Sequence, residues 1–244
     1  MKALRAQTTA EVTMTLRRGE TLLLTLGIPL LLLVFFSEVK IVASQGAHPI
    51  DTVTPGIIAL AIMSTSMVSL GIATGFERGY GVLKRLGATP LGRGRLLAAK
   101  IAGVLLVEAL QVIAICLVAL ALGWNPGGGS TALLQVIGAC LLGSLAFGGI
   151  GLTMAGRLKA EVNLAAANGL YLVLLLLGGM VVPLSVLPGP LRAIAEVLPA
   201  AALSGAIHEA VGAPGGYAGC WYVLGAWAVA TPIIAAGVFR FSGD

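Results

Sequence analysis

Six apolar segments divide this sequence, and each has about the length that an α-helix needs to cross a bilayer. Because a hydrocarbon core is about 30 Å thick, a spanning helix takes about 20 apolar residues. Backbone N–H and C=O groups find no water inside lipid, so such segments must satisfy these groups as helices. The sequence therefore predicts an all-α integral membrane protein, with a single transmembrane domain over residues 1–244. Its six predicted transmembrane helices span residues 21–37, 56–75, 96–122, 132–155, 162–182 and 218–239.

The small number of charged residues excludes a water-soluble domain. Only 10% of the residues are charged and 58% are hydrophobic, whereas soluble domains carry roughly 25% charged residues. The formal net charge of +5 could suggest nucleic acid as a partner. However, the basic residues lie at the ends of apolar segments rather than in one patch, and aromatic residues make up only 5% of the chain. We therefore expect membrane lipid, and no nucleic acid, around this chain.

No metal or nucleotide site is predicted within the chain. The cysteines, Cys116, Cys140 and Cys220, lie in apolar surroundings without CxxC or Cys/His spacing, and His48 and His208 are the only histidines. A phosphate-binding GxxxxGK[ST] loop is absent, since none of the five lysines follows a glycine. The chain is expected to bind no cofactor and to have no catalytic site of its own.

The basic residues predict how the spans are oriented. Loops rich in Lys and Arg remain in the cytoplasm. Every Lys and Arg except Lys40 and Arg192 lies within, or at the edge of, residues 1–20, 76–95, 156–161 and 240–244. These segments, and with them both termini, are expected in the cytoplasm. Residues 1–20 are mostly polar with scattered apolar positions, which predicts an interfacial helix on the inner membrane surface. A signal peptide is the competing interpretation of the first segment, but five further apolar segments follow it.

One cytoplasmic loop, residues 76–95, is dense in charge and predicts a short amphipathic helix. Residues 77–87 place Val82, Leu83 and Leu86 on one side, at spacings of three and four. Pro90 forbids continuation soon after Gly87. Such a helix has two plausible uses. It can be a surface linker whose Lys and Arg side chains reach the headgroups, or it can dock in a groove on a soluble partner.

This loop also resembles a known family. Between the second and third apolar segments the chain reads Glu77-Arg78-x-x-Gly-Val-Leu-Lys-Arg-Leu-x-x-x-Pro90. That pattern is similar to the intracellular segment of type-2 ABC exporter permeases, which shows Glu-Arg, then Gly-Thr-Leu, a charged pair, Leu and Pro. Val82 stands where Thr is commoner, and both are β-branched. The stretch Pro183-Leu-Ser-Val-Leu-Pro188 also resembles the family, and the similarity extends over almost the whole chain.

The resemblance implies a function and partners. It implies a G-subfamily-like fold and the permease subunit of an exporter in the bacterial inner membrane, paired with a second permease copy or a paralogue. A separate ATPase subunit would bind ATP and Mg²⁺, and residues 77–87 would be the coupling helix that contacts it. Spans with little charge suit an apolar or amphipathic cargo, such as a drug, as in multidrug efflux, or a lipid-like molecule. The implied ATPase contacts are Glu77, Arg78, Val82, Leu83, Lys84, Arg85 and Leu86.

The outer segment 183–217 is apolar and rich in Pro and Ala. The resemblance implies short re-entrant helices that dip into the outer leaflet between spans five and six. The alternative is an ordinary outer loop with one amphipathic helix at residues 190–198. In either case Glu196, His208 and Glu209 are expected to face water.

Polar residues inside the spans are costly in lipid and are therefore candidate sites. Glu108 lies midway along the third span, and an ionised carboxylate there needs a partner or water, or else it stays protonated. It could contact a substrate or a proton, or it could hydrogen-bond another helix. The transport route of the similar family runs between the second and fifth spans of two subunits. On that basis the possible pathway-lining residues are Ser66, Ser69, Glu108, Asn163 and Asn168.

Two other classes of function remain as alternatives. A passive channel or a structural membrane protein would need no ATPase partner. An intramembrane enzyme needs paired acids, nucleophiles or metal ligands at bilayer depth, and in these spans Glu108 stands without a second carboxylate or a histidine. Gly71, Gly75 and Gly79 recur every four residues and permit close helix packing, either within one subunit or between two.

Overall fold

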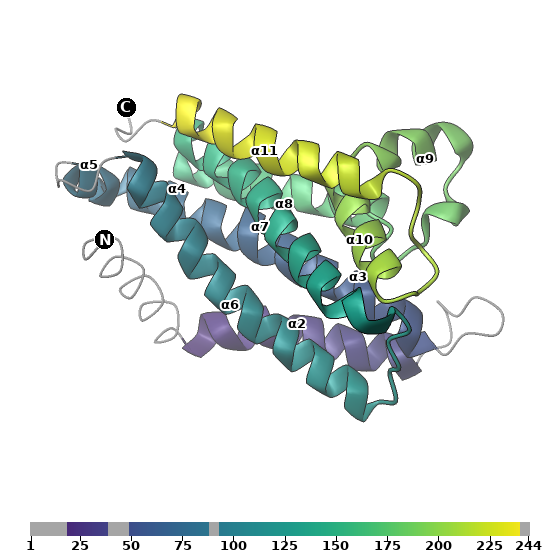
Figure 1. The fold of residues 1–244 in the computed structure, drawn as a ribbon. Coiled ribbons are helices and arrows are strands. Elements are labelled where there is room, and N and C mark those ends of the chain that lie inside the picture. The colour runs from purple at the N-terminus through teal and green to yellow at the C-terminus, as the bar shows by residue number, and fades with distance from the viewer. Residues whose placement is uncertain (1–18, 39–48, 88–92, 240–244) are drawn as a thin grey trace.

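The computed structural model describes residues 19–38, 49–87 and 93–239, without the side chains of residues 19–24, 86–87 and 93–97. The described residues form a bundle of helices without a strand (Figure 1), so the predicted all-α fold is confirmed for this part of the chain. The predicted interfacial helix at residues 1–20 lies outside the described residues, apart from the last two positions, which begin α2 (Gly19–Glu38).

Five helices of the described chain are long and apolar enough to cross a membrane. The first is a continuous helix of 31 residues, Pro49–Gly79. It comprises α3 (Pro49–Met63), the π-helix η1 (Ser64–Ser69) and α4 (Leu70–Gly79). The short α5 (Val82–Gly87) follows it. The other four are α6 (Arg93–Ala121), α7 (Ala132–Arg157), α8 (Ala160–Leu177) and α11 (Cys220–Val238). The predicted first span corresponds to α2, which is apolar over Thr25–Glu38.

Two span boundaries differ most from the sequence prediction. The second span begins at Pro49 rather than residue 56. Among the polar residues of these first turns, the Thr54 hydroxyl donates to the Ile50 carbonyl oxygen of the same helix at 2.7 Å, which lets it be buried. The fifth span ends at Leu177 rather than residue 182. Gly179 adopts a left-handed conformation with φ of 63°, which ends the helix before Pro183 is reached.

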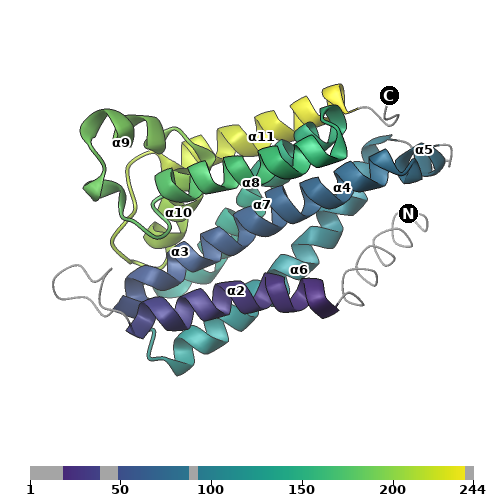
Figure 2. The same cartoon turned by 180° about the vertical axis from the view of Figure 1, so that it is seen from behind.

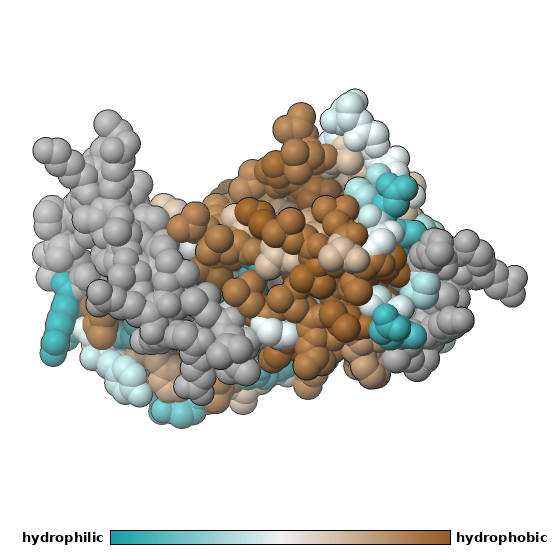
Figure 3. All heavy atoms as spheres, turned by 90° about the horizontal axis from the view of Figure 1, so that it is seen from below, coloured by the Kyte–Doolittle hydropathy of each residue, from teal (hydrophilic) through white to brown (hydrophobic). Residues whose placement is uncertain are grey.

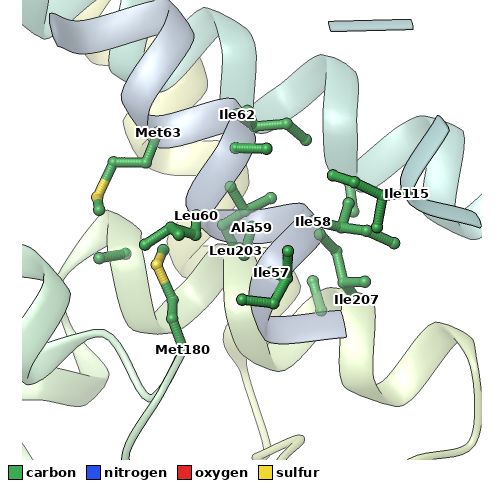
Figure 4. Close-up of a cluster of buried hydrophobic side chains, with 14 of the residues drawn as sticks. Ile57, Ile58, Ala59, Leu60, Ile62, Met63, Ile115, Met180, Leu203 and Ile207 are labelled. Atoms are coloured by element: carbon green, nitrogen blue, oxygen red, sulfur yellow. The ribbon is translucent and has the colours of Figure 1, made fainter. Parts of the chain in front are cut away.

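The core of the bundle surrounds α3. Every residue of α3 except Pro49 and Asp51 is buried, and its neighbours are α2, α6, α7 and α10 (Pro199–Ala210). Figure 4 shows Ile57, Ile58 and Leu60 of α3 beside Leu203 and Ile207 of α10. A hydrophobic helix buried on all sides in this way must be enclosed by other helices.

Small residues let α7 and α11 approach closely. A Cβ atom added to Gly149 would lie 2.4 Å from Oγ1 of Thr231, and that hydroxyl donates to the Ala146 carbonyl oxygen at 2.8 Å. Close backbone approach with a hydroxyl between helices is typical of packing in lipid, where the hydrophobic effect does not drive helices together.

The outer surface of the bundle is apolar over a wide area. Figure 3 shows a broad hydrophobic region across the middle of one face, with hydrophilic residues toward the two ends. Exposed side chains such as Leu117, Leu134, Leu172 and Ile233 come from α6, α7, α8 and α11. A surface this apolar needs lipid contact rather than water. The chain is therefore a multi-pass membrane protein.

The two ends of the bundle carry different features (Figures 1 and 2). One end, the α5 end, bears α5 and the C-terminal end of α11. The other, the α9 end, bears the short 3₁₀ helix η3 (Leu184–Val186), α9 (Gly189–Glu196) and the beginning of α10. Helices α9 and α10 are bent by 82° relative to each other. Residues 183–217 thus hold two α-helices rather than the single one of the ordinary-loop interpretation.

The polar residues at the α9 end differ in exposure. The expectation that His208 faces water is wrong: it is 3% exposed, and its Nε2 lies 3.1 Å from the Thr52 carbonyl oxygen. The Tyr217 hydroxyl donates to the Glu196 carbonyl oxygen at 2.6 Å. Burial raises the pKa of the Tyr217 phenol, so it keeps the proton that this bond requires. These contacts fix α10 against the start of α3, and the segment that follows α10 against α9.

Candidate functional site

The junction of α4 and α5 lies at the α5 end of the bundle. The predicted single helix over residues 77–87 is divided there, because Tyr80 and Gly81 leave the helix between Gly79 and Val82. Gly81 has φ of 71°, a left-handed conformation that glycine adopts without a steric cost. The turn is closed by the Gly81 N–H, which donates to the Arg78 carbonyl oxygen at 3.0 Å. As a result Glu77 and Arg78 belong to the last turn of α4, and Val82 begins a new helix.

Glu77 ties α4 to α6. Its Oε2 lies 2.6 Å from Nζ of Lys100, and the side chains are 28% and 2% exposed, respectively. A buried ammonium requires such a partner, and removing one member of a buried pair leaves a costly uncompensated charge.

Arg78 ties α4 to the end of α7. Its guanidinium donates to the Gly156 carbonyl oxygen and, at 2.7 Å, to that of Leu158. The last carbonyl groups of a helix lack intrahelical donors, and a cation there also meets the negative end of the helix dipole. The Arg78 side chain is therefore directed into the bundle and is only 7% exposed.

The exposed surface of α5 comes from other residues. Leu83 is fully buried in an apolar cluster with Leu152 and Phe239, so it anchors α5 to the bundle. The side chain of Leu86 lies outside the described residues. The side chains exposed on α5 and on the turn that precedes it, which we call the α5 surface, are Tyr80, Val82, Lys84 and Arg85.

A groove lies between α2, the η1 region and α8; Figure 2 shows α2 and α8 in one view with the helix that contains η1. The volume of the groove is about 370 Å³. Two of the predicted pathway residues line it, Ser69 of η1 and Asn168 of α8. The sequence-based set missed Tyr171, whose spacing of three from Asn168 places both on one face of α8. The remaining lining residues are Thr25, Ile28, Pro29, Leu60, Ser64 and Val68.

Asn163, in contrast, serves packing within the chain. It is fully buried, and its Nδ2 donates to the Gly71 carbonyl oxygen at 2.8 Å. A Cβ atom on Gly75 would lie 2.7 Å from the same Nδ2, and one on Gly71 would lie 3.1 Å from the Gly151 carbonyl oxygen. Two of the regularly spaced glycines thus let α4 approach α7 and α8 of the same chain.

Ser66 and Glu108 belong to a buried polar network on the opposite side of η1 from the groove. Glu108 of α6 is 3% exposed, and its carboxyl group is hydrogen-bonded to the hydroxyls of Ser66 and of Ser144 on α7. One turn later, Gln111 accepts a hydrogen bond from Thr65 at 2.9 Å and donates to the Thr25 carbonyl oxygen at 2.7 Å. The network therefore connects α2, η1, α6 and α7. Within the described part of the chain, no group of three His, Cys, Asp or Glu residues could hold a metal ion.

Comparison with known proteins identifies relatives of this chain. Residues 2–209 match the sequence model of the family described as "ABC-2 type transporter". The chain is also 29% identical over 205 residues to a protein of Bacillus subtilis (strain 168) named as a transport permease, YvfS. That match covers 82% of this chain and 81% of the relative.

Proposed function

Because the chain belongs to the ABC-2 type transporter family, we propose that it is the transmembrane permease subunit of an ATP-binding cassette exporter. The family itself indicates a membrane permease subunit that pairs with an ATP-binding subunit. Our proposal adds that the partner hydrolyses ATP with Mg²⁺, that its closure is transmitted to the spans, and that the substrate leaves outward. A second permease copy or paralogue would complete the assembly.

The α5 surface is the observation that carries this proposal. A short helix at the end of a membrane bundle, held by a buried Leu83 and exposing Val82, Lys84 and Arg85, has the form of an element that docks in a groove of a soluble partner. Only Arg192, among the described Lys and Arg residues, lies at the α9 end. By the rule that basic loops stay inside, the α5 end would face the cytoplasm, where ATP is. Both termini would lie there too, in a bacterial inner membrane.

The coupling residues would then have two roles. Val82, Lys84 and Arg85, with Leu86 as a further predicted contact, would touch the ATPase subunit. Glu77 and Arg78 would pass its movement on, because they connect the same junction to α6 through Lys100 and to α7 through two carbonyl groups. A displacement of α5 would thus be transmitted to α4, α6 and α7 together.

The groove between α2, η1 and α8 is the part of this chain that we propose lines the pathway. Polar groups and apolar side chains share its wall, which suits an amphipathic drug-like or lipid-like cargo; the polar residues are Thr25, Ser64, Ser69, Asn168 and Tyr171. At the opposite end, Leu191 and Ile194 of α9 and Val197, its C-cap residue, are exposed. These side chains would contact lipid if α9 and α10 form re-entrant helices that cap the pathway.

Co-purification tests the proposal directly. An ATP-binding cassette subunit expressed together with the chain should be retained by it, and the double charge reversal Lys84→Glu/Arg85→Glu should abolish retention. The matched control is Arg192→Glu, an exposed basic residue at the α9 end, which should leave retention unchanged. Retention that survives the α5 reversal would contradict the docking role. A chain that retains no ATPase at all would favour a passive channel or a structural membrane protein.

A further inference from the structure

The π-helix η1 separates the groove from the buried polar network. A π-helical turn is rare, and it occurs mostly where a helix serves a function. In this chain it lies in the middle of a 31-residue helix. Its Ser64 and Ser69 line the groove, whereas Thr65 and Ser66 bond to Gln111 and Glu108 behind it. The hydrogen bonds that hold Thr65 and Ser66 therefore also hold the side of η1 that forms a wall of the groove.

The two hydrogen-bond partners of Ser144 favour a protonated Glu108. The Ser144 hydroxyl has one hydrogen, and its Oγ lies 2.8 Å from the Cys140 carbonyl oxygen, which can only accept. The same Oγ also lies within hydrogen-bond distance of Oε2 of Glu108, and both bonds can form at once only if Ser144 donates to Cys140 and accepts from the carboxyl group. The carboxyl group must then supply the hydrogen of that bond, which requires its protonated form. Ser66 donates to the other carboxyl oxygen, so every group of the cluster is satisfied.

The surroundings of Glu108 agree with a neutral acid. The polar and titratable groups that meet it are Ser66 of η1 and Ser144 with the nearby Cys140 of α7. The cation two turns earlier on α6, Lys100, is paired with Glu77. An ionised carboxylate this deeply buried, bonded only to hydroxyls, would bear a large desolvation cost.

We infer that Glu108 is held as a neutral carboxylic acid that positions η1, and that it thereby fixes the groove wall carrying Ser64 and Ser69. Gln111, one turn away on α6, acts in the same way on α2 through the Thr25 carbonyl group. Glu108 and Gln111 of α6 do not line the groove themselves, but they hold η1 and α2, which form two of its walls. The consequence for transport rests on the proposed function, but the protonation state and the groove geometry do not.

Infrared difference spectroscopy tests the protonation state. The spectrum of the purified wild-type chain at neutral pH minus that of Glu108→Gln should show the carbonyl stretch of a protonated carboxylic acid. Glutamine keeps the shape of the neutral acid, because its amide N–H can donate to Ser144 while its oxygen accepts from Ser66. Carboxylate bands in place of the acid band would overturn the inference.

Thiol labelling tests the positioning role. With the native cysteines replaced by alanine, Ser69→Cys reports the groove, and Tyr222→Cys, at an 86% exposed position on α11, is the reference. Glu108→Gln should leave Ser69→Cys labelling within about twofold of the parent. Glu108→Leu cannot bond to Ser66 or Ser144, and it should change the labelling of Ser69→Cys by about fivefold or more. A change of this size corresponds to one or two lost hydrogen bonds. Labelling at Tyr222→Cys should not change in either variant.

If Glu108→Gln alters labelling as strongly as Glu108→Leu, the neutral-acid inference fails, because an ionised group would then be needed. These two readouts do not involve the ATPase subunit. Failure of the exporter proposal, seen as no retained ATPase, would therefore be distinguishable from failure of this inference.

Discussion

At the scale of single residues, side chains of the same type have different tasks according to the direction in which they point. Arg78 and Arg85 both lie in the predicted coupling segment. Arg78 is buried against two carbonyl groups at the end of α7, whereas Arg85 is exposed on α5. The first is suited to transmit movement and the second to contact a partner. Their substitutions should therefore have different consequences.

Arg78→Ala should weaken both the bundle and the coupling of ATP hydrolysis to transport. Two carbonyl groups at the end of α7 lose their donor, and each lost hydrogen bond to a charged group costs about 1.5–3 kcal/mol. The purified chain should unfold at a lower temperature, and Arg78→Lys should recover only part of the loss because an ammonium lacks the guanidinium fork. Arg157→Ala, at an exposed position, is the matched control and should change stability by less than about 0.5 kcal/mol. Unfolding of Arg78→Ala at the wild-type temperature would contradict this role.

At the scale of elements, the break between α4 and α5 decides what the coupling segment presents. Left-handed backbone at Gly81 turns the chain so that Leu83 enters the apolar cluster while Val82 and Lys84 remain outside. A continuous helix over residues 77–87 would lack this turn and would direct these side chains elsewhere.

Gly81→Ala should therefore disturb α5 through the backbone alone. An added Cβ atom meets no other atom within 4 Å, so the cost is that of left-handed backbone, roughly 1–2 kcal/mol. We expect weaker retention of the ATPase subunit in co-purification. Gly225→Ala, in the interior of α11 and also in open space, is the control and should be neutral or slightly stabilising. Equal retention by the two variants would show that the turn does not matter.

The elements could be predicted better than their boundaries and faces. Hydrophobicity finds the spans because lipid demands long apolar helices. The start of α3, however, contains the polar residues Asp51 and Thr52, and Thr52 is covered by α10, whose His208 meets its carbonyl oxygen. The sequence could not show that Ser69 lines the groove whereas Ser66 belongs to the buried network with Glu108. The π-helical turn between them changes the helical phase, so a regular period of 3.6 does not apply. The sequence also could not show that Asn163 is buried in packing while Asn168 lines the groove, because this difference depends on the helices that pack beside α8.

At the scale of the whole molecule, the asymmetry of charge between the two ends gives the bundle its expected orientation. The basic side chains of Lys84, Arg85, Arg157 and Lys159 lie at the α5 end, and Arg192 lies at the other. The same asymmetry was visible in the sequence, because it depends on loop composition rather than on packing.

Topology can be read by cysteine labelling in intact cells. With native cysteines replaced, Arg192→Cys should react with a membrane-impermeant maleimide added outside, and Arg157→Cys should react only after the membrane is opened. Both positions are exposed in the structure, so a difference in labelling reports sidedness rather than burial. Reaction of Arg157→Cys in intact cells would place the α5 end outside and would exclude contact with a cytoplasmic ATPase.

The central claim, that α5 docks into an ATP-binding subunit, is tested most directly by site-specific photocrosslinking. A benzophenone amino acid placed at position 84 should form a covalent adduct with the co-expressed ATPase subunit, and the same probe at position 192 should form none. An adduct from position 84 alone is the predicted result. No adduct from position 84, in a preparation where the chain is folded and the ATPase subunit is present, would contradict the account.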